Sequence, residues 1–168
     1  YVETTIGVGI GEKLLNRKTS SVAIPQLGLS LRDVEEEKAL SRLLHRDNIS
    51  FRLLAPTFSE RPKGKEGIPF AGDGLIKSMD DFRKTFSLPE PEDDSIYEAI
   101  KPFIEQKEEF AVICSTRLGF LSALISIGFQ TYMESIYLNP ELIDTVTGAY
   151  VDWSAKVLRR VCDMGVDA

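Results

Sequence analysis

The sequence predicts an α/β protein with a parallel sheet, on three observations. Short apolar runs typical of buried strands occur at Ser21–Ile24, Asn48–Ala55 and Phe110–Cys114. Segments with helical periodicity separate these runs. A long helical segment, Asn139–Met164, is followed by a glycine and by a strand-like onset at Val166. Because helix, glycine and strand onset form the joint of a repeating α/β unit, we expect Val166 to begin a fourth, buried strand.

Two helices are expected around the first strand. The first is short, Glu12–Arg17, and the second lies in GLSLRDVEEEKALSRLLHRD. Ser30, with Asp33 three residues on, is predicted to cap the second helix. Its buried stripe consists of Val34, Leu40, Leu43 and Leu44. The acid run DVEEEK is expected on the solvated surface, because carboxylates at a helix start interact favourably with the helix dipole.

An irregular insertion separates the second strand from the remaining helices. Residues Thr57 to Lys77 are rich in glycine, proline and charge, which predicts a long loop or hairpin over one end of the fold. Ser78 then caps a short helix. Ser95-x-x-Glu98 forms a capping box for the next helix, and Pro102 inside that helix predicts a kink or two short pieces.

Three strands and the onset of a fourth fit either a small open sheet or the N-terminal portion of a (β/α)8 barrel, a fold of about 250 residues. We expect Ser21–Ile24, Ile49–Leu54 and Phe110–Cys114 to be neighbouring parallel strands in one sheet, because their long connections allow helical crossovers. If the fold is the barrel, we expect residues 1–168 to be the N-terminal part of a single barrel domain.

Such a half-barrel would leave an uncovered apolar layer that includes Phe110, Val112 and Cys114. Exposed apolar surface of that size is rare on soluble monomers. We therefore expect either the remainder of the barrel or a homodimer partner to cover it, and we favour the remainder because domains rarely end at a strand onset.

Composition restricts the classes of partner. The chain has 20 Lys and Arg against 26 Asp and Glu, a net charge of -6, which is opposite to the basic surface that nucleic acid selects. No apolar run approaches the roughly 18 to 20 residues that span a bilayer, and the opening YVETTIGVGIGEKLL lacks the pattern of a signal peptide. We therefore expect a cytoplasmic protein without nucleic acid or membrane partners. Cys114 and Cys162 are expected to be buried free thiols.

Nucleotide and metal signals are weak in this sequence. The glycines of IGVGIGEK do not have the G-x-G-x-x-G spacing of a phosphate-binding loop, so a flexible lead-in is expected there. The single histidine, His45, is predicted to cap a last helical turn. With one histidine and two distant cysteines, spacing predicts no zinc site within this chain.

Four polar side chains mark the places where α/β barrels carry their chemistry, at and beyond the C-terminal ends of strands. Arg52 shares a strand face with Ser50 and would be a buried cation with an anionic partner if that face lines a barrel mouth. Thr116 and Arg117 follow the third strand, and Arg117 serves either to bind a carboxylate or phosphate or to form a surface ion pair. Asp73 belongs either to a lid or to a glycine-flanked turn. We predict that Arg52, Asp73, Thr116 and Arg117 surround one substrate-binding cleft.

Three stretches share their pattern with a known family. They are PFAGDGLIKSMDDFRKTFSLPEPEDDSIYE, FAVICSTRLGF and ESIYLNPELIDTVTGAYVDWSAKVLRRVCDMGVDA. The most specific feature is a leucine before NPEL and a long helix that ends in Gly-x-Asp-Ala, here Gly165 to Ala168. From about Gly11 to its last residue, the chain resembles the uroporphyrinogen decarboxylase superfamily, which also contains corrinoid-dependent methyltransferases. The resemblance implies a (β/α)8 barrel, of which this chain would be roughly the N-terminal half.

The family contains two chemistries. Its decarboxylases have an arginine-rich RQAGR segment after the first strand, an aspartate at the end of the second and a tyrosine in the helix after the third. This chain has PQLGLSLRD, FRLLAP and Leu124 at these places. A substrate with many carboxylates needs clustered cations, and that cluster is missing. Methyl transfer involving a corrinoid protein is therefore the leading hypothesis, and uroporphyrinogen decarboxylation in porphyrin biosynthesis is the alternative.

A third hypothesis is a non-catalytic half-barrel that binds a partner. In the methyltransferase branch of the family, the C-terminal half of the polypeptide supplies a zinc site with histidine and cysteine ligands. The resemblance therefore implies no metal or cofactor on this chain alone, and zinc with a corrinoid partner for the full-length protein. The expected partners are a small-molecule substrate and a corrinoid protein.

Overall fold

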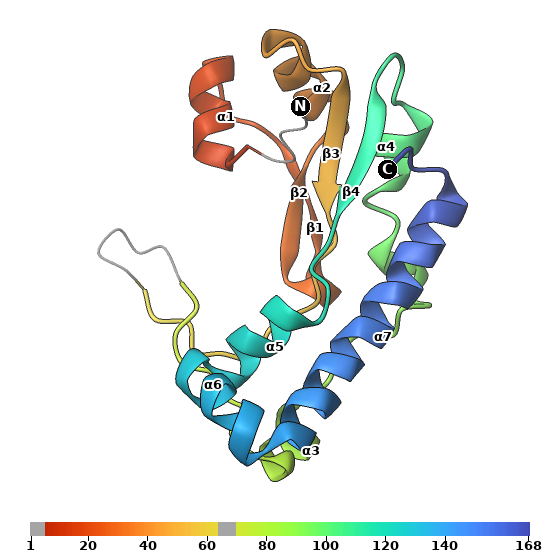
Figure 1. The fold of residues 1–168 in the computed structure, drawn as a ribbon. Coiled ribbons are helices and arrows are strands. Elements are labelled where there is room, and N and C mark those ends of the chain that lie inside the picture. The colour runs from red at the N-terminus through yellow and green to blue at the C-terminus, as the bar shows by residue number, and fades with distance from the viewer. Residues whose placement is uncertain (1–5, 64–69) are drawn as a thin grey trace. The chain divides into compact units, whose positions relative to one another are not determined.

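The computed structural model describes residues 6–63 and 70–168, which form a mixed α/β fold without a closed barrel among the described elements (Figure 1). Its elements, in order, are α1 (Val8–Leu15), β1 (Ser21–Ile24), η1 (Pro25–Leu27), β2 (Leu29–Arg32), α2 (Val34–Leu43), β3 (Asn48–Arg52), α3 (Met79–Thr85), η2 (Asp94–Ile96), α4 (Lys101–Glu105), β4 (Ala111–Ser115), α5 (Phe120–Ile127), α6 (Phe129–Leu138) and α7 (Pro140–Met164). The α/β class predicted from the sequence is confirmed.

The chain forms two compact units. The first contains the described residues up to Leu54, together with Pro89–Thr116 and Lys156–Ala168. The second contains the described parts of Ala55–Leu88 and Arg117–Ala155. The helix α7 contributes residues to both units. No helix among the described residues is long and apolar enough to cross a membrane.

The strands β3 and β4 form a parallel pair, as predicted. Their register pairs Asn48 with Ala111 and Arg52 with Ser115. The first four residues of β3, including the apolar Ile49 and Phe51, are buried, while the last residue of the strand, Arg52, is exposed. The strand pattern therefore fixes which side chains of β3 enter the core of the first unit.

The predicted place of Ser21–Ile24 in that parallel sheet is wrong. This segment, β1, pairs antiparallel with β2 in a separate two-stranded sheet, from Ser21 with Arg32 to Ile24 with Leu29. The short helix η1 and Gly28, at φ 61°, reverse the chain between the two strands. GLSLR is consequently a strand and not a helix start.

The predicted N-cap residue of α2, Ser30, is wrong, because Ser30 belongs to the strand β2. Ser30 lies within β2, and Asp33 is the N-cap, with its carboxylate accepting from the Glu35 N–H at 3.0 Å. A similar shift occurs before α4, where Asp93 and not Ser95 caps the 3-10 helix η2. The predicted division into two short pieces is confirmed, since η2 ends at Ile96 and α4 carries Pro102 in its first turn.

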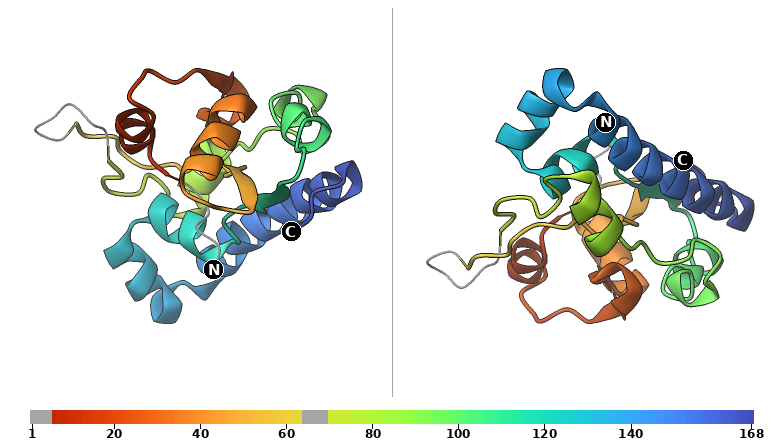
Figure 2. Two further views of the ribbon diagram at one scale, coloured as in Figure 1. Left: turned by 90° about the horizontal axis from the view of Figure 1, so that it is seen from above. Right: turned by 90° about the horizontal axis from the view of Figure 1, so that it is seen from below.

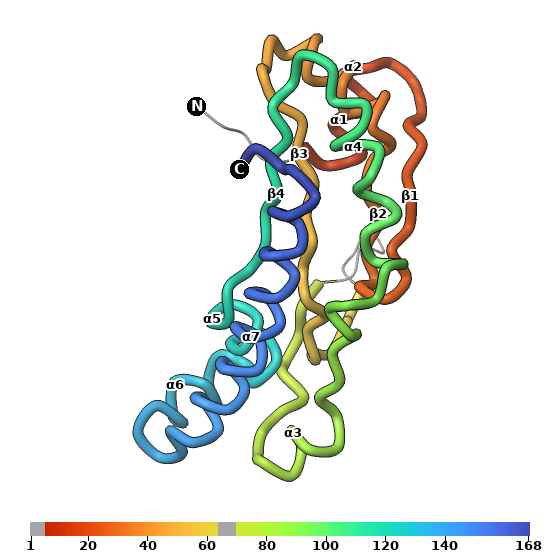
Figure 3. The backbone as a smooth tube through the Cα atoms, turned by 90° about the vertical axis from the view of Figure 1, so that its right-hand side faces the viewer, coloured from red at the N-terminus to blue at the C-terminus, as the bar shows by residue number. Residues whose placement is uncertain are grey.

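The last residues of the chain lie beside β4 (Figures 1 and 3). The helix α7 ends at Gly165, which has φ 99°. The Ala168 N–H donates to the Val112 carbonyl at 3.2 Å, and the Ala168 carbonyl accepts from the Cys114 N–H at 2.8 Å. These two bonds flank the pair Ile113 and Ala168 in the manner of a parallel ladder. The predicted strand onset is therefore hydrogen-bonded to β4, although Val166 is half-buried and not buried.

The predicted apolar layer is covered for two of its three side chains. Phe110 is 4% exposed and Val112 is fully buried, whereas Cys114 is half-buried. The Arg42 guanidinium lies 5.3 Å from the centroid of the Phe110 ring. The prediction of an uncovered layer at Phe110 and Val112 is therefore wrong, because other side chains of the first unit cover them.

The second unit is organised around Tyr150 of α7. The Tyr150 hydroxyl lies 2.8 Å from the Ser126 hydroxyl and donates to the Pro56 carbonyl at 2.9 Å. The ring of Phe86 meets the Tyr150 ring edge-on at 5.2 Å between centroids. Helices α5 and α6 pack against each other, side by side in Figure 2. One buried tyrosine thus connects the irregular insertion to the helices of this unit.

Candidate functional site

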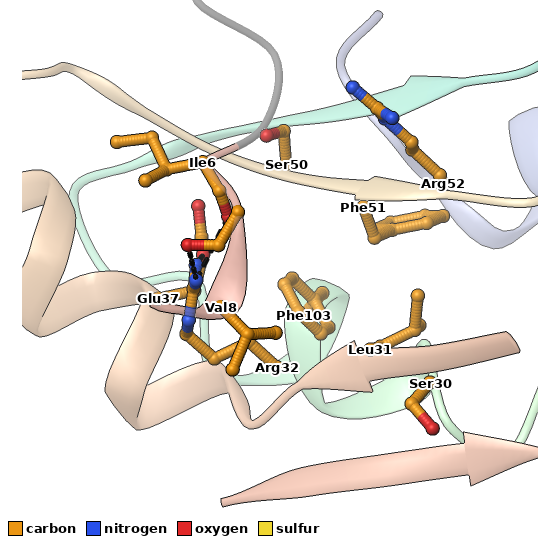
Figure 4. A pocket seen from close by; sticks show the side chains of 11 residues that line it. Ile6, Val8, Ser30, Leu31, Arg32, Glu37, Ser50, Phe51, Arg52 and Phe103 are labelled. Atoms are coloured by element: carbon orange, nitrogen blue, oxygen red, sulfur yellow. Dashed lines mark hydrogen bonds and ion pairs between the residues drawn. The ribbon is translucent and has the colours of Figure 1, made fainter. Parts of the chain in front are cut away.

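A cavity of about 300 Å³ lies in the first unit, between β2, β3, α4 and the residues that lead into α1 (Figure 4). Its lining residues are Ile6, Gly7, Val8, Ser30, Leu31, Arg32, Glu37, Ser50, Phe51, Arg52 and Phe103. This volume is at the lower end of the range for small-molecule sites. The cavity occupies the position along β3 where the sequence predicted a neighbouring parallel strand.

Apolar side chains form one wall of this cavity. The rings of Phe51 and Phe103 meet edge-on at 5.3 Å between centroids, and Leu31 is 6% exposed beside them (Figure 4). Since these side chains are packed against one another, the wall is preformed.

A buried ion cluster stands at the other end of the cavity. The Glu37 carboxylate accepts from the Arg32 guanidinium at 2.5 Å and from the Arg46 guanidinium at 2.9 Å. Only 7% of the Arg32 side chain and 3% of the Glu37 side chain are exposed. Arg32 also donates to the Ile6 carbonyl at 2.9 Å. Two guanidinium groups therefore share one carboxylate in a poorly solvated place.

The polar wall of the cavity comes from the open edge of β3. On either side of β3, the Asp47 carbonyl accepts from the Ala111 N–H and the Leu53 N–H donates to the Ser115 carbonyl. Because backbone groups of alternate residues point to the same edge of a strand, the odd-numbered residues of β3 bond to β4. The N–H groups of Ser50 and Arg52 therefore face the opposite edge. Both side chains leave β3 on the side opposite to Phe51 (Figure 4).

Ser50 and Arg52 lack partners within the described chain. Ser50 is 5% exposed, and its hydroxyl has no hydrogen-bond partner. The Arg52 side chain is exposed, and residues 6–63 and 70–168 offer it neither an ion pair nor a hydrogen bond. The expectation of a buried Arg52 is therefore wrong, because this face of β3 opens outward at Arg52.

Two of the four predicted site residues belong to the first unit. Arg52 pairs in register with Ser115, and Thr116 follows directly. The Thr116 hydroxyl donates to the Leu53 carbonyl at 2.6 Å, which extends the connection between the strands by one residue. Arg52 is thus available to a ligand, whereas Thr116 secures the strand ends.

Asp73 and Arg117 belong to the second unit, so a cleft shared by all four residues stays a prediction. The Asp73 carboxylate accepts from Lys77 at 2.7 Å and from the Gly74 N–H at 2.8 Å, and the Lys77 contact holds the pKa of Asp73 below its usual value. Lys77 also donates to the Ile127 carbonyl at 2.9 Å. Asp73 therefore holds Lys77, which in turn binds the end of α5, and this role agrees with the predicted glycine-flanked turn. The Arg117 carbonyl accepts from the Ser154 hydroxyl at 3.0 Å.

The buried charges of α2 were missed from the sequence. The acid run DVEEEK was expected on the solvated surface, but Glu36, Glu37 and Lys38 are all buried. Glu36 pairs with Arg17, and Lys38, at 1% exposure, donates to Glu108 at 2.6 Å. Glu36 and Lys38 have partners far away along the chain in Arg17 and Glu108, whereas Lys38 also pairs with Glu35 three residues before it, a local spacing that the sequence does show. The alternation of LSLR, which puts Leu31 and Arg32 on opposite faces, was the available signal for a strand.

The sequence predicted no zinc site for the single histidine and the two cysteines, and this stays a prediction. Within residues 6–63 and 70–168, no group of three or more His, Cys, Asp or Glu side chains is placed to hold a metal ion. His45 follows the C-cap residue Leu44 at φ 52° and is exposed; it lies just beyond the last helical turn, and its N–H donates to the Arg42 carbonyl of that turn at 3.2 Å. Cys162 is exposed and not buried, while burial raises the pKa of Cys114 to about 11. These residues do not fit a zinc ion.

In comparisons with protein-family models, curated proteins and solved structures, none matched this chain.

Proposed function

We propose that this chain is the N-terminal portion of a (β/α)8 barrel enzyme related to the uroporphyrinogen decarboxylase superfamily, and that the enzyme transfers methyl groups to or from a corrinoid protein. One observation carries the proposal. β3 and β4 form a parallel pair, and Ala168, which follows α7, exchanges backbone hydrogen bonds with Val112 and Cys114 of β4, with helices in each connection. This progression supports the resemblance of the sequence to a (β/α)8 family.

The polar groups beside β3 support methyl transfer over decarboxylation. A cavity of about 300 Å³ suits a small substrate. A porphyrinogen is a large macrocycle with many carboxylates and would need several unpaired cations. Arg32 and Arg46 already share Glu37, which leaves Arg52 as the one arginine lining this cavity without a partner among the described residues.

In this proposal the chain binds and orients the small substrate. The corrinoid protein supplies the methyl group or accepts it. Arg52 and the open edge of β3 hold the polar end of the substrate, and Phe51 with Phe103 exclude water from its apolar end.

The test is a product analysis with the purified full-length protein that contains this chain. Methylcobalamin and a thiol are supplied together, and uroporphyrinogen is supplied in a parallel reaction. The proposal predicts that the methyl group passes to the thiolate, giving a methyl thioether and cob(I)alamin. Formation of coproporphyrinogen would instead establish decarboxylation, and the absence of both products would favour a non-catalytic binding module.

A further inference from the structure

We infer that the cavity between β2 and β3 binds a small organic carboxylate, whose apolar body lies against Phe51 and Phe103 and whose charged end is held by Ser50 and Arg52. This inference deepens the proposed function and rests on it only in treating the ligand as a substrate. Binding itself requires no methyl transfer.

The buried hydroxyl of Ser50 is the first observation that points to a ligand. A hydroxyl that is removed from water without a partner costs roughly 1 to 3 kcal/mol. Ser50 is 5% exposed and lines the cavity, and its hydroxyl has no hydrogen-bond partner among the described residues. An acceptor atom inside the cavity would satisfy this hydroxyl.

The charge balance around the cavity is the second observation. Glu37 is the acidic residue of the lining, and it is already bound by Arg32 and by Arg46. Arg52 has no acidic partner in the described part of the chain, so the cationic side chains around the cavity outnumber the single carboxylate of Glu37. The cavity therefore favours an anion over a neutral or cationic ligand.

The geometry of donors narrows the anion to a carboxylate. Ser50 and Arg52 lie two residues apart on one side of β3, and their N–H groups share its open edge. A carboxylate accepts two parallel bonds from a guanidinium and keeps lone pairs for a hydroxyl or an amide. The aromatic wall of Phe51 and Phe103 lies on the other side of β3, so an apolar substituent on the same molecule would reach it past the open edge of the strand.

Calorimetric titration of the full chain with phenylacetate tests the inference, and phenylacetamide is the neutral control ligand. We expect phenylacetate to bind and the amide to bind at least roughly tenfold more weakly, because a charge-assisted bond is lost. In Arg52→Gln the affinity for phenylacetate should fall roughly tenfold to a hundredfold. The matched variant Arg83→Gln, which removes an exposed arginine outside the cavity, should bind as the wild type does.

Ser50→Ala separates a ligand-binding role from a structural one. Removing a buried hydroxyl that has no partner should leave the stability of the free protein unchanged or raise it. The same change should weaken phenylacetate binding severalfold. Loss of stability in Ser50→Ala with unchanged affinity would overturn the role of Ser50.

Equal affinity for acid and amide, or no binding of phenylacetate at millimolar concentration, would overturn the whole inference. Because these measurements omit methylcobalamin, phenylacetate binding without methyl transfer would contradict only the proposed function. Methyl transfer without phenylacetate binding would contradict only this inference.

Discussion

Different interactions stabilise the interior of each of the two units. In the first unit, a parallel strand pair is combined with buried ion pairs such as Glu37 with Arg32, whose side chains are 3% and 7% exposed. In the second unit, helices and an irregular insertion meet around Tyr150 and around the close approach of Gly74 to Gly128. The first unit therefore adds buried charges to its apolar core, whereas the second unit adds a close backbone approach and a buried hydroxyl.

The surfaces of the units differ as well. The first unit contains a cavity lined by Ser50, whose hydroxyl has no partner among the described residues, and by Arg52; the second unit also has buried hydroxyls without a described partner, such as Ser59 and Ser122. The second unit exposes large apolar side chains on α6, including Phe129 at 68% and Tyr137 at 87%. Polar groups that are buried without partners indicate a ligand more specifically than exposed apolar side chains do, since nothing in the second unit shows what covers α6.

The largest effect should come from Glu37→Gln, which leaves Arg32 and Arg46 buried without their shared anion. We expect a loss of about 3 to 5 kcal/mol in the free energy of unfolding of the first unit, measured by urea denaturation. Glu98→Gln is the control, because Glu98 pairs with Lys101 on the exposed surface, where such pairs contribute about 0 to 1 kcal/mol. Similar losses in both variants would contradict a charge-dependent first unit.

The next effect concerns shape in the second unit. A methyl group at Gly74 would overlap backbone atoms of Ser126, Ile127 and Gly128, so Gly74→Ala should destabilise this unit by about 3 kcal/mol. Gly148→Ala meets no atom and lies inside α7, so it should stabilise by about 0.5 to 1 kcal/mol. Thermal unfolding of the two variants measures this contrast, and equal shifts in melting temperature would refute it.

Alkaline pH should weaken the second unit through Tyr150. Burial raises the pKa of Tyr150 to about 12, from about 10 in the unfolded chain. The unfolded state loses this proton first, so stability is full below pH 10 and falls by about 2 to 3 kcal/mol as the pH rises towards 12. Tyr150→Phe should be less stable at neutral pH by about 1 to 2 kcal/mol, because the Pro56 carbonyl loses its donor.

The same variant supplies the test of the Tyr150 prediction. Urea denaturation of wild type and Tyr150→Phe is compared at several pH values from 9 to about 12. The stability difference between them should shrink as the pH rises through this range. A constant difference would show that Tyr150 does not carry the alkaline loss.

A smaller alkaline effect is expected in the first unit. Burial raises the pKa of Cys114 to about 11, above that of an unfolded cysteine near 9. Stability from this group is therefore complete below pH 9 and declines between pH 9 and 11. Since Cys114 is only half-buried, we expect a loss of about 1 to 2 kcal/mol, which Cys114→Ala should abolish. If the decline persists in that variant, another group causes it.

Regular elements were predictable from local pattern, and the cavity was not. Apolar runs with long connections between them predicted the parallel pairing of β3 with β4, and Asn139 with Pro140 marked the start of α7. The hairpin of β1 and β2 was missed because LSLRD contains both a strand alternation and a plausible helix cap. Tertiary pairing decided between the two interpretations.

The candidate site was predicted only in part for the same reason. Arg52 was recognisable as a polar residue at a strand end. The unpartnered hydroxyl of Ser50 and the pairing of Glu37 with Arg32 and Arg46 depend on packing, which no local spacing encodes. Asp73 looked equally suited to a lid or a turn, and its contact with Lys77 shows the turn.

The parallel order of β3, β4 and residues 166–168 is the central claim of this account, and backbone NMR of the isotope-labelled chain tests it most directly. We expect nuclear Overhauser contacts between the backbones of Ile113 and Ala168, together with slow hydrogen exchange of the Cys114 amide, because that N–H donates to the Ala168 carbonyl at 2.8 Å. A Cys114 amide that exchanges at the rate of an unfolded chain, without contacts between Ile113 and Ala168, would contradict the parallel progression and remove the main support for a barrel-type enzyme.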